Sequence, residues 1–468
     1  MLRIFDEEYK QLKLWMDGSP ANLYQVPKEL DMMAKILDRI EVLQPFIDQY
    51  SKAVQAGELT LTGRNTIPLR TFVGIMFLYK KYGLGFRLTM ERIADSLAWR
   101  AFCRIPLDKE VPDYSTINKL ANRFGADAVD KMNTALLQHL KGEKILKTRK
   151  LRMDTTVVES NIAYPTDAGL LSQGIKTINR LVSKLKKAGV KAADDFVAHE
   201  RVVKKKILEI GKVAKRRTGE AINEINKITK ELTKISEDTL SAGKNVLKGA
   251  KISLAKGNRV VQRKVVHQLN ETCELMKKAI TQAKTVVSGN RHLEDRLVSI
   301  HDPEARPISK GKSGQKVQFG RKLLLTANEQ GFITSHRTFL GNPNDKTLYQ
   351  IGVEDHCRNV RKKPKEAATD RGFYSPKNEE YSTNENIRLS MPKIGKKSKE
   401  RIIIEKTRWF KRLQRFRAGM EAIISNANRR SGLCNPLTRG TDKTECSISW
   451  SLFSYNLAQV PIVVKADK

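Results

Sequence analysis

The chain has 468 residues, and its 87 Lys and Arg residues against 51 Asp and Glu residues give a formal charge of +36. That length exceeds one ordinary hydrophobic core, so we expect about three domains. So large an excess of positive charge opposes compaction and favours a polyanionic partner. DNA is the natural partner because basic proteins release its condensed counterions, although a ribosome-associated protein would carry a similar charge. No apolar run of about 18 residues occurs, so the sequence predicts no membrane span.

Metal-binding residues of the zinc type are sparse. The five cysteines stand far apart without a CxxC pair, and the seven histidines do not cluster. This pattern fits a reducing cytoplasm and argues against structural zinc, so we expect any bound metal ion to have oxygen ligands. The charged start of the chain, Met1 to Tyr9, lacks the apolar core of a signal peptide. We therefore expect a cytoplasmic protein.

Residues 1–148 are predicted to form a helical N-terminal domain. The apolar run over 71–81 (TFVGIMFLYKK) predicts a buried helix, and 88–102 has helical spacing. Ser115 is predicted to cap the next helix.

The helix after Ser115 has two distinct faces. One face is apolar and carries Ile117, Leu120, Ala121 and Phe124. The other face is polar and carries Asn118, Lys119, Asn122 and Arg123. This arrangement suits a helix-turn-helix motif in a DNA major groove, while an ordinary helical hairpin with a solvated face would give the same pattern.

The chain changes character near residue 149. Residues 151–158 (LRMDTTVV) predict a short apolar strand with Asp154 inside it, and a buried lone carboxylate is costly without a partner or a metal ion. Residues 169–296 are predicted to be a long basic helical insertion. Within it, residues 171–290 hold 27 Lys or Arg against 11 Asp or Glu, with one aromatic residue. The sequence leaves open whether the insertion contacts DNA or acts as a spacer.

From residue 297 to residue 468 the pattern is mixed α/β. The predicted elements are a hairpin of two strands (316–327 and 331–340), a helix (344–360), two short strands (365–370 and 387–391) and a closing packed segment (450–464). Residues 393–417 form a basic stretch with interleaved aromatic residues, which suits a helix along a phosphate backbone or a basic face over an aromatic core contact. This order predicts an α/β, ribonuclease-H-like catalytic core formed by residues 149–168 and 297–468.

Three acids occupy comparable positions in this predicted core. Asp154 lies in the first strand, Asp370 ends a later strand, and Glu421 lies on a late helix. Carboxylates placed in this way can converge on two Mg²⁺ or Mn²⁺ ions about 3.5–4 Å apart, which suit an in-line displacement at phosphorus. Spacing alone is weak support, because the chain has 51 acids. Glu405 is a rival third acid, since basic residues flank it at the same spacings.

Four sequence blocks together resemble a known family. They are PDYSTINKLANRF (112–124), MDTTVVESNIAYPTD (153–167), ATDRGFYSPKN (368–378) and RWFKRLQRFRAGMEAIISNANRRSGL (408–433). In this order they resemble DDE-type insertion-sequence transposases, most nearly the ISNCY-like group with an InsH-type helical N-terminal domain. The resemblance covers most of the chain outside the basic insertion.

The resemblance implies catalysis of DNA cleavage and strand transfer by a bacterial, nucleoid-associated enzyme. It assigns Asp154, Asp370 and Glu421 as the three catalytic acids and metal ligands. The partners implied are the element's terminal inverted repeats, target DNA and a second copy of the chain, because two DNA ends must be brought together. DNA contacts are expected at Asn118, Lys119, Arg123, Arg408, Lys411, Arg412, Arg417 and Arg429.

Two positions depart from the family pattern. Gln414 stands where a tyrosine is frequent, and Asn428 stands where a lysine is frequent. Both positions are expected to hold DNA near the metal ions. Two alternatives therefore stay open: a ribonuclease-H-like nuclease without strand transfer, and a decayed, non-catalytic DNA-binding protein.

Overall fold

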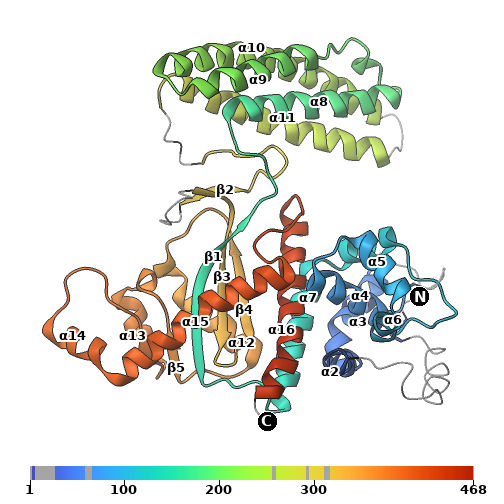
Figure 1. Ribbon diagram of the computed structural model, residues 1–468. Coiled ribbons are helices and arrows are strands. Elements are labelled where there is room, and N and C mark those ends of the chain that lie inside the picture. Colours follow the sequence, from blue (N-terminus) through green and yellow to red (C-terminus); the bar gives the residue numbers. More distant parts are fainter. Residues whose placement is uncertain are drawn as a thin grey trace. The chain divides into compact units, whose positions relative to one another are not determined.

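The computed structural model describes residues 3–5, 27–57, 66–255, 260–290, 293, 295–309 and 317–466. The chain forms two compact units: unit 1 comprises residues 1–159 and 321–468, and unit 2 comprises residues 160–320. Helices occur in both units, and the sheet is mixed, so the expected mixed α/β class is confirmed (Figure 1). Lys316, the predicted start of the first hairpin strand, lies outside the described residues.

The N-terminal part of unit 1 is helical. Its helices are α2 (Lys28–Leu37), α3 (Ile40–Gln55), α4 (Leu69–Tyr82), α5 (Phe86–Asp95), α6 (Leu97–Cys103) and α7 (Tyr114–Gly142). The buried helix predicted over 71–81 is confirmed as α4, in which eleven residues are buried.

Two predictions for this part were wrong in detail. The helix expected over 88–102 is two helices, because Ser96 adopts an extended backbone and caps α6 by accepting a hydrogen bond from the Trp99 amide at 3.3 Å. The cap of α7 is Asp113, not Ser115. The Asp113 carboxylate accepts from the Ser115 amide at 2.8 Å, and a negative charge also suits the positive end of a helix.

The sheet of unit 1 has the strand order β4-β3-β1-β5-β6. Its strands are β1 (Lys150–Glu159), β3 (Val317–Asn328), β4 (Ile333–Phe339), β5 (Glu366–Ala368) and β6 (Arg388–Ser390). β3 and β4 pair antiparallel, which confirms the predicted hairpin, and Gly331 adopts a φ of 85° in the connection. β5 pairs parallel with both β1 and β6.

Helices cover both faces of this sheet. Side chains alternate along β3, so that Leu324 packs with α12 (Tyr349–Val360), while Leu323 and Leu325 pack with α15 (Arg408–Ser431) and α16 (Thr441–Ala466). The smaller elements between them are η3 (Asp345–Thr347), η4 (Arg371–Phe373), α13 (Pro376–Asn384) and α14 (Lys399–Lys406).

The predicted closing segment is confirmed as the buried helix α16. Its residues Ile448 and Leu452 pack with the sheet, while Trp450 and Phe453 pack with the N-terminal helices. Within unit 1, α16 therefore lies between the sheet and the N-terminal helices (Figure 1). The N-terminal helices therefore form one apolar cluster with Trp450 and Phe453 of α16, while the two faces of the sheet have clusters of their own.

In the part of the chain that the structure describes, unit 2 contains four α-helices. They are α8 (Asp167–Lys187), α9 (Glu200–Val213), α10 (Gly219–Ala255) and α11 (Val260–Val287), with η1 (Lys191–Ala193), η2 (Ala214–Arg216) and β2 (Arg306–Ser309) beside them. β2 pairs antiparallel with residues 317–320 of β3. The predicted insertion, 169–296, lies within this unit, and its polar and basic residues cover an interior of leucine, valine and isoleucine.

A buried arginine links α4 to the loop after α2. The Arg70 side chain has no exposed surface, and its Nε lies 2.8 Å from Asp38 Oδ1. Asp38 also pairs with Arg104. Burial raises the pKa of Asp38, but hydrogen bonds and charge attraction from Arg104 and Arg70 outweigh burial and leave that pKa below its usual value.

We predict that Asp38→Ala destabilises unit 1 by about 3 kcal/mol, because it leaves a buried guanidinium without its counter-charge. Urea unfolding followed by tryptophan fluorescence measures the change. The control is Asp31→Ala, which removes an exposed pair with Lys35 and should hardly move the midpoint. Equal midpoints for the two variants would contradict the prediction.

Candidate functional site

The alternation of side chains along β1 sends Asp154 toward α15. Leu151 and Met153 join the apolar cluster on the α12 side of the sheet. Arg152 lies on the other face, with its guanidinium 4.5 Å from the centre of the Phe416 ring on α15. Asp154 follows two residues later and faces the same way, and 17% of its side chain is exposed.

The register of β1 with β5 brings Asp154 next to Asp370. Arg152 is opposite Ala368, and the same register continued for two residues aligns Asp154 with Asp370. Asp370 caps η4, and its Oδ1 accepts from the Gly372 amide at 2.9 Å. Because β1 and β5 are parallel neighbours inside the sheet, the two acids lie side by side where β5 has just ended.

Helix α15 adds Arg417 and Glu421, which are one helical turn apart. Arg417 Nη2 lies 3.8 Å from Asp154 Oδ2 and 3.9 Å from Asp370 Oδ2. Arg417 Nη1 lies 3.5 Å from Glu421 Oε1. The three predicted acids therefore gather around a single guanidinium, with Glu421, which is 75% exposed, on its outer side.

The electrostatics of the site favour a cation. Burial, followed by repulsion from Asp370, raises the pKa of Asp154 to about 6, although Arg417 opposes the shift. Burial also raises the pKa of Asp370, again against the attraction of Arg417. Two neighbouring carboxylates with raised pKa values, such as those of Asp154 and Asp370, are stabilised by additional positive charge.

The acidic side chains at this point offer oxygen ligands, which are the donors that Mg²⁺ and Mn²⁺ prefer. Across the described part of the chain, no three His, Cys, Asp or Glu side chains are grouped so as to hold one metal ion. This is consistent with the position of Arg417, which lies between the two aspartates and Glu421. The arrangement provides a pair of aspartates, and Glu421 and Arg417 must reorient for all three acids to share ions.

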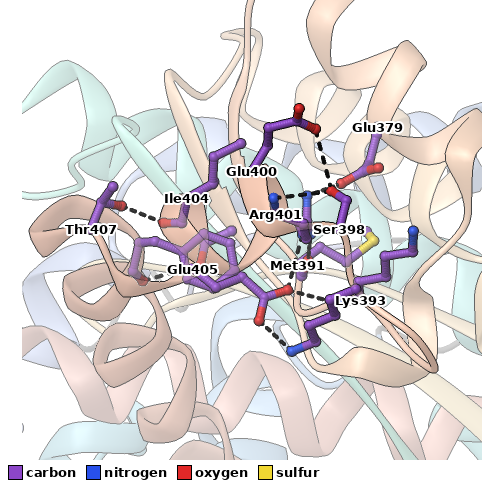
Figure 2. Close-up of polar contacts among 12 residues, drawn as sticks. Glu379, Met391, Lys393, Ser398, Glu400, Arg401, Ile404, Glu405 and Thr407 are labelled. Atoms are coloured by element: carbon purple, nitrogen blue, oxygen red, sulfur yellow. Dashed lines mark hydrogen bonds and ion pairs between the residues drawn. The ribbon is translucent and has the colours of Figure 1, made fainter.

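The rival acid, Glu405, is engaged elsewhere (Figure 2). Its Oε1 accepts from the Lys393 amide at 2.9 Å and from Arg401 Nε at 3.0 Å, and its Oε2 pairs with Lys397. Burial raises the pKa of Glu405, but these hydrogen bonds outweigh burial and lower it overall. These partners all belong to the segment around α14, and they leave Glu405 occupied by structural ion pairs.

The residues predicted to contact DNA fall into three groups. On α7, the exposed ones are Asn118, Lys119 and Arg123. On α15, the exposed ones are Arg408, Lys411, Arg412 and Arg429. Two of these have protein partners: Arg412 pairs with the buried Glu366 at 3.0 Å, and Arg429 donates to Asn426 at 2.8 Å. Arg417 differs from the rest, because it faces the acids.

The basic stretch predicted as one helix over 393–417 is interrupted. It forms α14 and the start of α15, separated by the extended Thr407. The two departures from the family pattern have local partners. Gln414 Nε2 donates to the Ser390 carbonyl at 2.9 Å, and Asn428 Oδ1 accepts from the Cys434 amide at 3.0 Å. Both residues tie α15 to the rest of unit 1.

Sequence reasoning missed Asp345. It begins η3, and its Oδ1 accepts from Thr155 Oγ1 at 3.1 Å and pairs with Lys322 Nζ at 2.6 Å. Repulsion from Asp345 contributes to the raised pKa values of Asp154 and Asp370. The sequence offers no signal for this placement, because Asn344-Asp345 has the ordinary pattern of a helix start.

Comparison with known proteins gives one family match. Residues 22–123 match the family model described as "Transposase domain (DUF772)". This match supports a transposase role. The matched region covers α2 to α6 and the start of α7, including Asn118, Lys119 and Arg123, and a transposase acts on DNA.

A similar curated protein is the "Uncharacterized protein ORF8 in nfe locus" of Rhizobium meliloti. It is 27% identical over 144 residues, which cover 29% of this chain and 66% of that protein, slightly under two thirds of its length. No solved structure matches the chain. Among the described residues, no helix combines the length and the apolar character that a membrane span requires.

Proposed function

We propose that this protein is a DDE-type insertion-sequence transposase of the ISNCY-like group. It binds the terminal inverted repeats of its element and catalyses DNA cleavage and strand transfer. The proposal depends on one observation: Asp154 lies beside Asp370 in the sheet, and Arg417 and Glu421 lie next to them, one turn apart on the covering helix α15. The transposase-domain match at residues 22–123 supports the same role.

The strand order supports a ribonuclease-H-like core for this enzyme. An antiparallel hairpin, β3 and β4, adjoins β1, and β5 and β6 continue parallel to β1 on its other side. Asp154 lies within β1, and Asp370 lies two residues after the end of β5, the parallel neighbour of β1.

In the proposed reaction, Asp154, Asp370 and Glu421 hold Mg²⁺ or Mn²⁺. Two such ions would activate a water or a 3′-hydroxyl for attack at phosphorus and stabilise the leaving oxygen. Asp154 lies within β1 and Asp370 caps η4, so the backbone already holds the two carboxylates side by side and they would need little reorganisation. Arg417 binds a phosphate oxygen once its guanidinium turns from the acids, because guanidinium groups pair with phosphate in a bidentate manner.

Further contacts would hold the DNA. The exposed Arg408 and Lys411 on α15 follow the phosphate backbone toward the acids, and the exposed face of α7 reads the inverted repeat. A homodimer is proposed because strand transfer joins two element ends to one target.

A second candidate is a DNA-binding protein that no longer cleaves. It is favoured by Gln414 and Asn428, whose amides hold protein groups instead of presenting a tyrosine and a lysine to DNA. Incubation of labelled element ends with the protein and Mn²⁺ separates the candidates. Joined products support the transposase, cut but unjoined products support a nuclease without strand transfer, and intact bound ends support the decayed protein.

We predict that Asp154→Asn and Asp370→Asn each abolish cleavage of labelled element ends, because each removes an ionised oxygen ligand. Binding of the same DNA in a mobility-shift assay should change by less than about threefold, because the DNA-holding cations remain. Cleavage that survives in either variant would eliminate the aspartate pair as the catalytic site.

The third acid is tested separately. We predict that Glu421→Gln lowers the cleavage rate by at least about 100-fold, while Glu405→Gln keeps most of it, because Glu421 lies beside Arg417 and Glu405 is engaged by Arg401 and Lys397. Glu405→Gln should instead lower the thermal midpoint, since Arg401 and Lys397 then have no shared carboxylate. The reverse pattern of rates would make Glu405 the third acid.

The basic insertion is tested by salt dependence. We predict that replacing Lys204, Lys205, Lys212 and Lys215 together by Gln reduces the slope of log affinity against log salt. The reduction should reach about 0.9 for each DNA phosphate that these lysines neutralise in the wild type. The matched control replaces four exposed lysines on other helices of unit 2, namely Lys227, Lys230, Lys264 and Lys277. If the first set leaves the slope unchanged, the region around α9 is a spacer.

A further inference from the structure

A buried lysine fixes the segment that carries Asp345. Lys322 lies on β3 with 9% of its side chain exposed, and its Nζ pairs with Asp345 Oδ1 at 2.6 Å. The same Nζ donates to the Pro343 carbonyl at 2.7 Å and to Asn342 Oδ1 at 3.2 Å. An unpaired ammonium would be costly at this depth, so Lys322 holds the loop and Asp345 in one arrangement.

This arrangement directs Asp345 toward both catalytic aspartates. Its Oδ1 accepts from the hydroxyl of Thr155, the neighbour of Asp154, at 3.1 Å. Its Oδ2 approaches Gly372: a Cβ at that glycine would lie 3.2 Å from Asp345 Oδ2 and 3.1 Å from Asp370 Oδ1. The carboxylates of Asp345 and Asp370 therefore border the same space next to Gly372. That space is open because glycine has no side chain to fill it.

The carboxylates of this site outnumber the cationic side chains that they contact. Four carboxylates, those of Asp154, Asp345, Asp370 and Glu421, are in ionic contact with two cations, Lys322 and Arg417. Among the described residues this leaves an excess of two formal negative charges, which one divalent cation would neutralise. Asp345 increases this excess beside Asp154 and Asp370.

We infer that Asp345 is a fourth carboxylate of the cation site, held in place by Lys322, and that it strengthens the binding of divalent cations by Asp154 and Asp370. The inference rests on the proposed function and extends it. Mg²⁺ and Mn²⁺ commonly keep several waters, and carboxylates that accept hydrogen bonds from such waters orient the ion. Asp345 is thus a positioning residue whose effect is measured on ion affinity itself.

The test is a titration of the full-length, DNA-free protein with Mn²⁺, followed by electron paramagnetic resonance of the free ion. Binding at the site is defined as the component that Asp154→Asn removes. We predict that Asp345→Asn weakens this component by about 10- to 100-fold, and that Asp345→Glu, which keeps the charge, weakens it less. The matched control is Asp127→Asn on α7, an exposed partner of Lys131, which should leave the affinity within about twofold.

A double variant separates ion binding from loop anchoring. If Asp345 served only to neutralise Lys322, then Lys322→Met combined with Asp345→Asn would restore wild-type Mn²⁺ affinity and overturn the inference. We expect the double variant to stay several-fold weaker. Equal affinity for wild type and Asp345→Asn would overturn this inference alone, whereas a wild type without an Asp154-dependent component would overturn the proposed cation site and this inference with it.

Discussion

Two carboxylates of like charge lie side by side: Asp154 lies within β1, and Asp370 follows the end of its parallel neighbour β5. The Arg417 guanidinium lies 3.8 Å from the first and 3.9 Å from the second. Burial and mutual repulsion raise the pKa of Asp154 to about 6, so the site is unfavourable without positive charge. Arg417 supplies one such charge from α15, and it also contacts Glu421. The same repulsion that makes the aspartates costly for the fold makes the pair suitable for divalent cations.

The rest of unit 1 holds Asp154, Asp370 and Arg417 in place. Backbone pairing between β1 and β5, which ends at Arg152 and Ala368, sets the register in which Asp154 and Asp370 follow. Arg152 packs on Phe416 and donates to its carbonyl at 2.9 Å, which fixes α15 over the sheet one residue before Arg417. Gln414 ties the same helix to the end of β6. Functional groups on strands and helices with such support are placed more accurately than groups on loops.

Much of this architecture could be predicted from local patterns. The hairpin of β3 and β4, the strand around Asp154 and the buried helices α4 and α16 follow from periodicity and apolar runs. The interruptions at Ser96 and Thr407 could not be predicted, because both depend on local backbone geometry inside otherwise helical patterns. The position of Asp345 at the site could not be predicted for another reason, because its contact with Thr155 joins positions 190 residues apart. Glu405 and Glu421 have similar flanking residues, and only the fold separates the ion-paired Glu405 from the Glu421 beside Arg417.

The most direct test of the central claim is anomalous X-ray diffraction from crystals of the protein bound to an element end in Mn²⁺. We predict anomalous density between the carboxylates of Asp154 and Asp370, with Arg417 turned toward a phosphate. Density at any other carboxylates, with Asp154 and Asp370 still facing only Arg417, would contradict it.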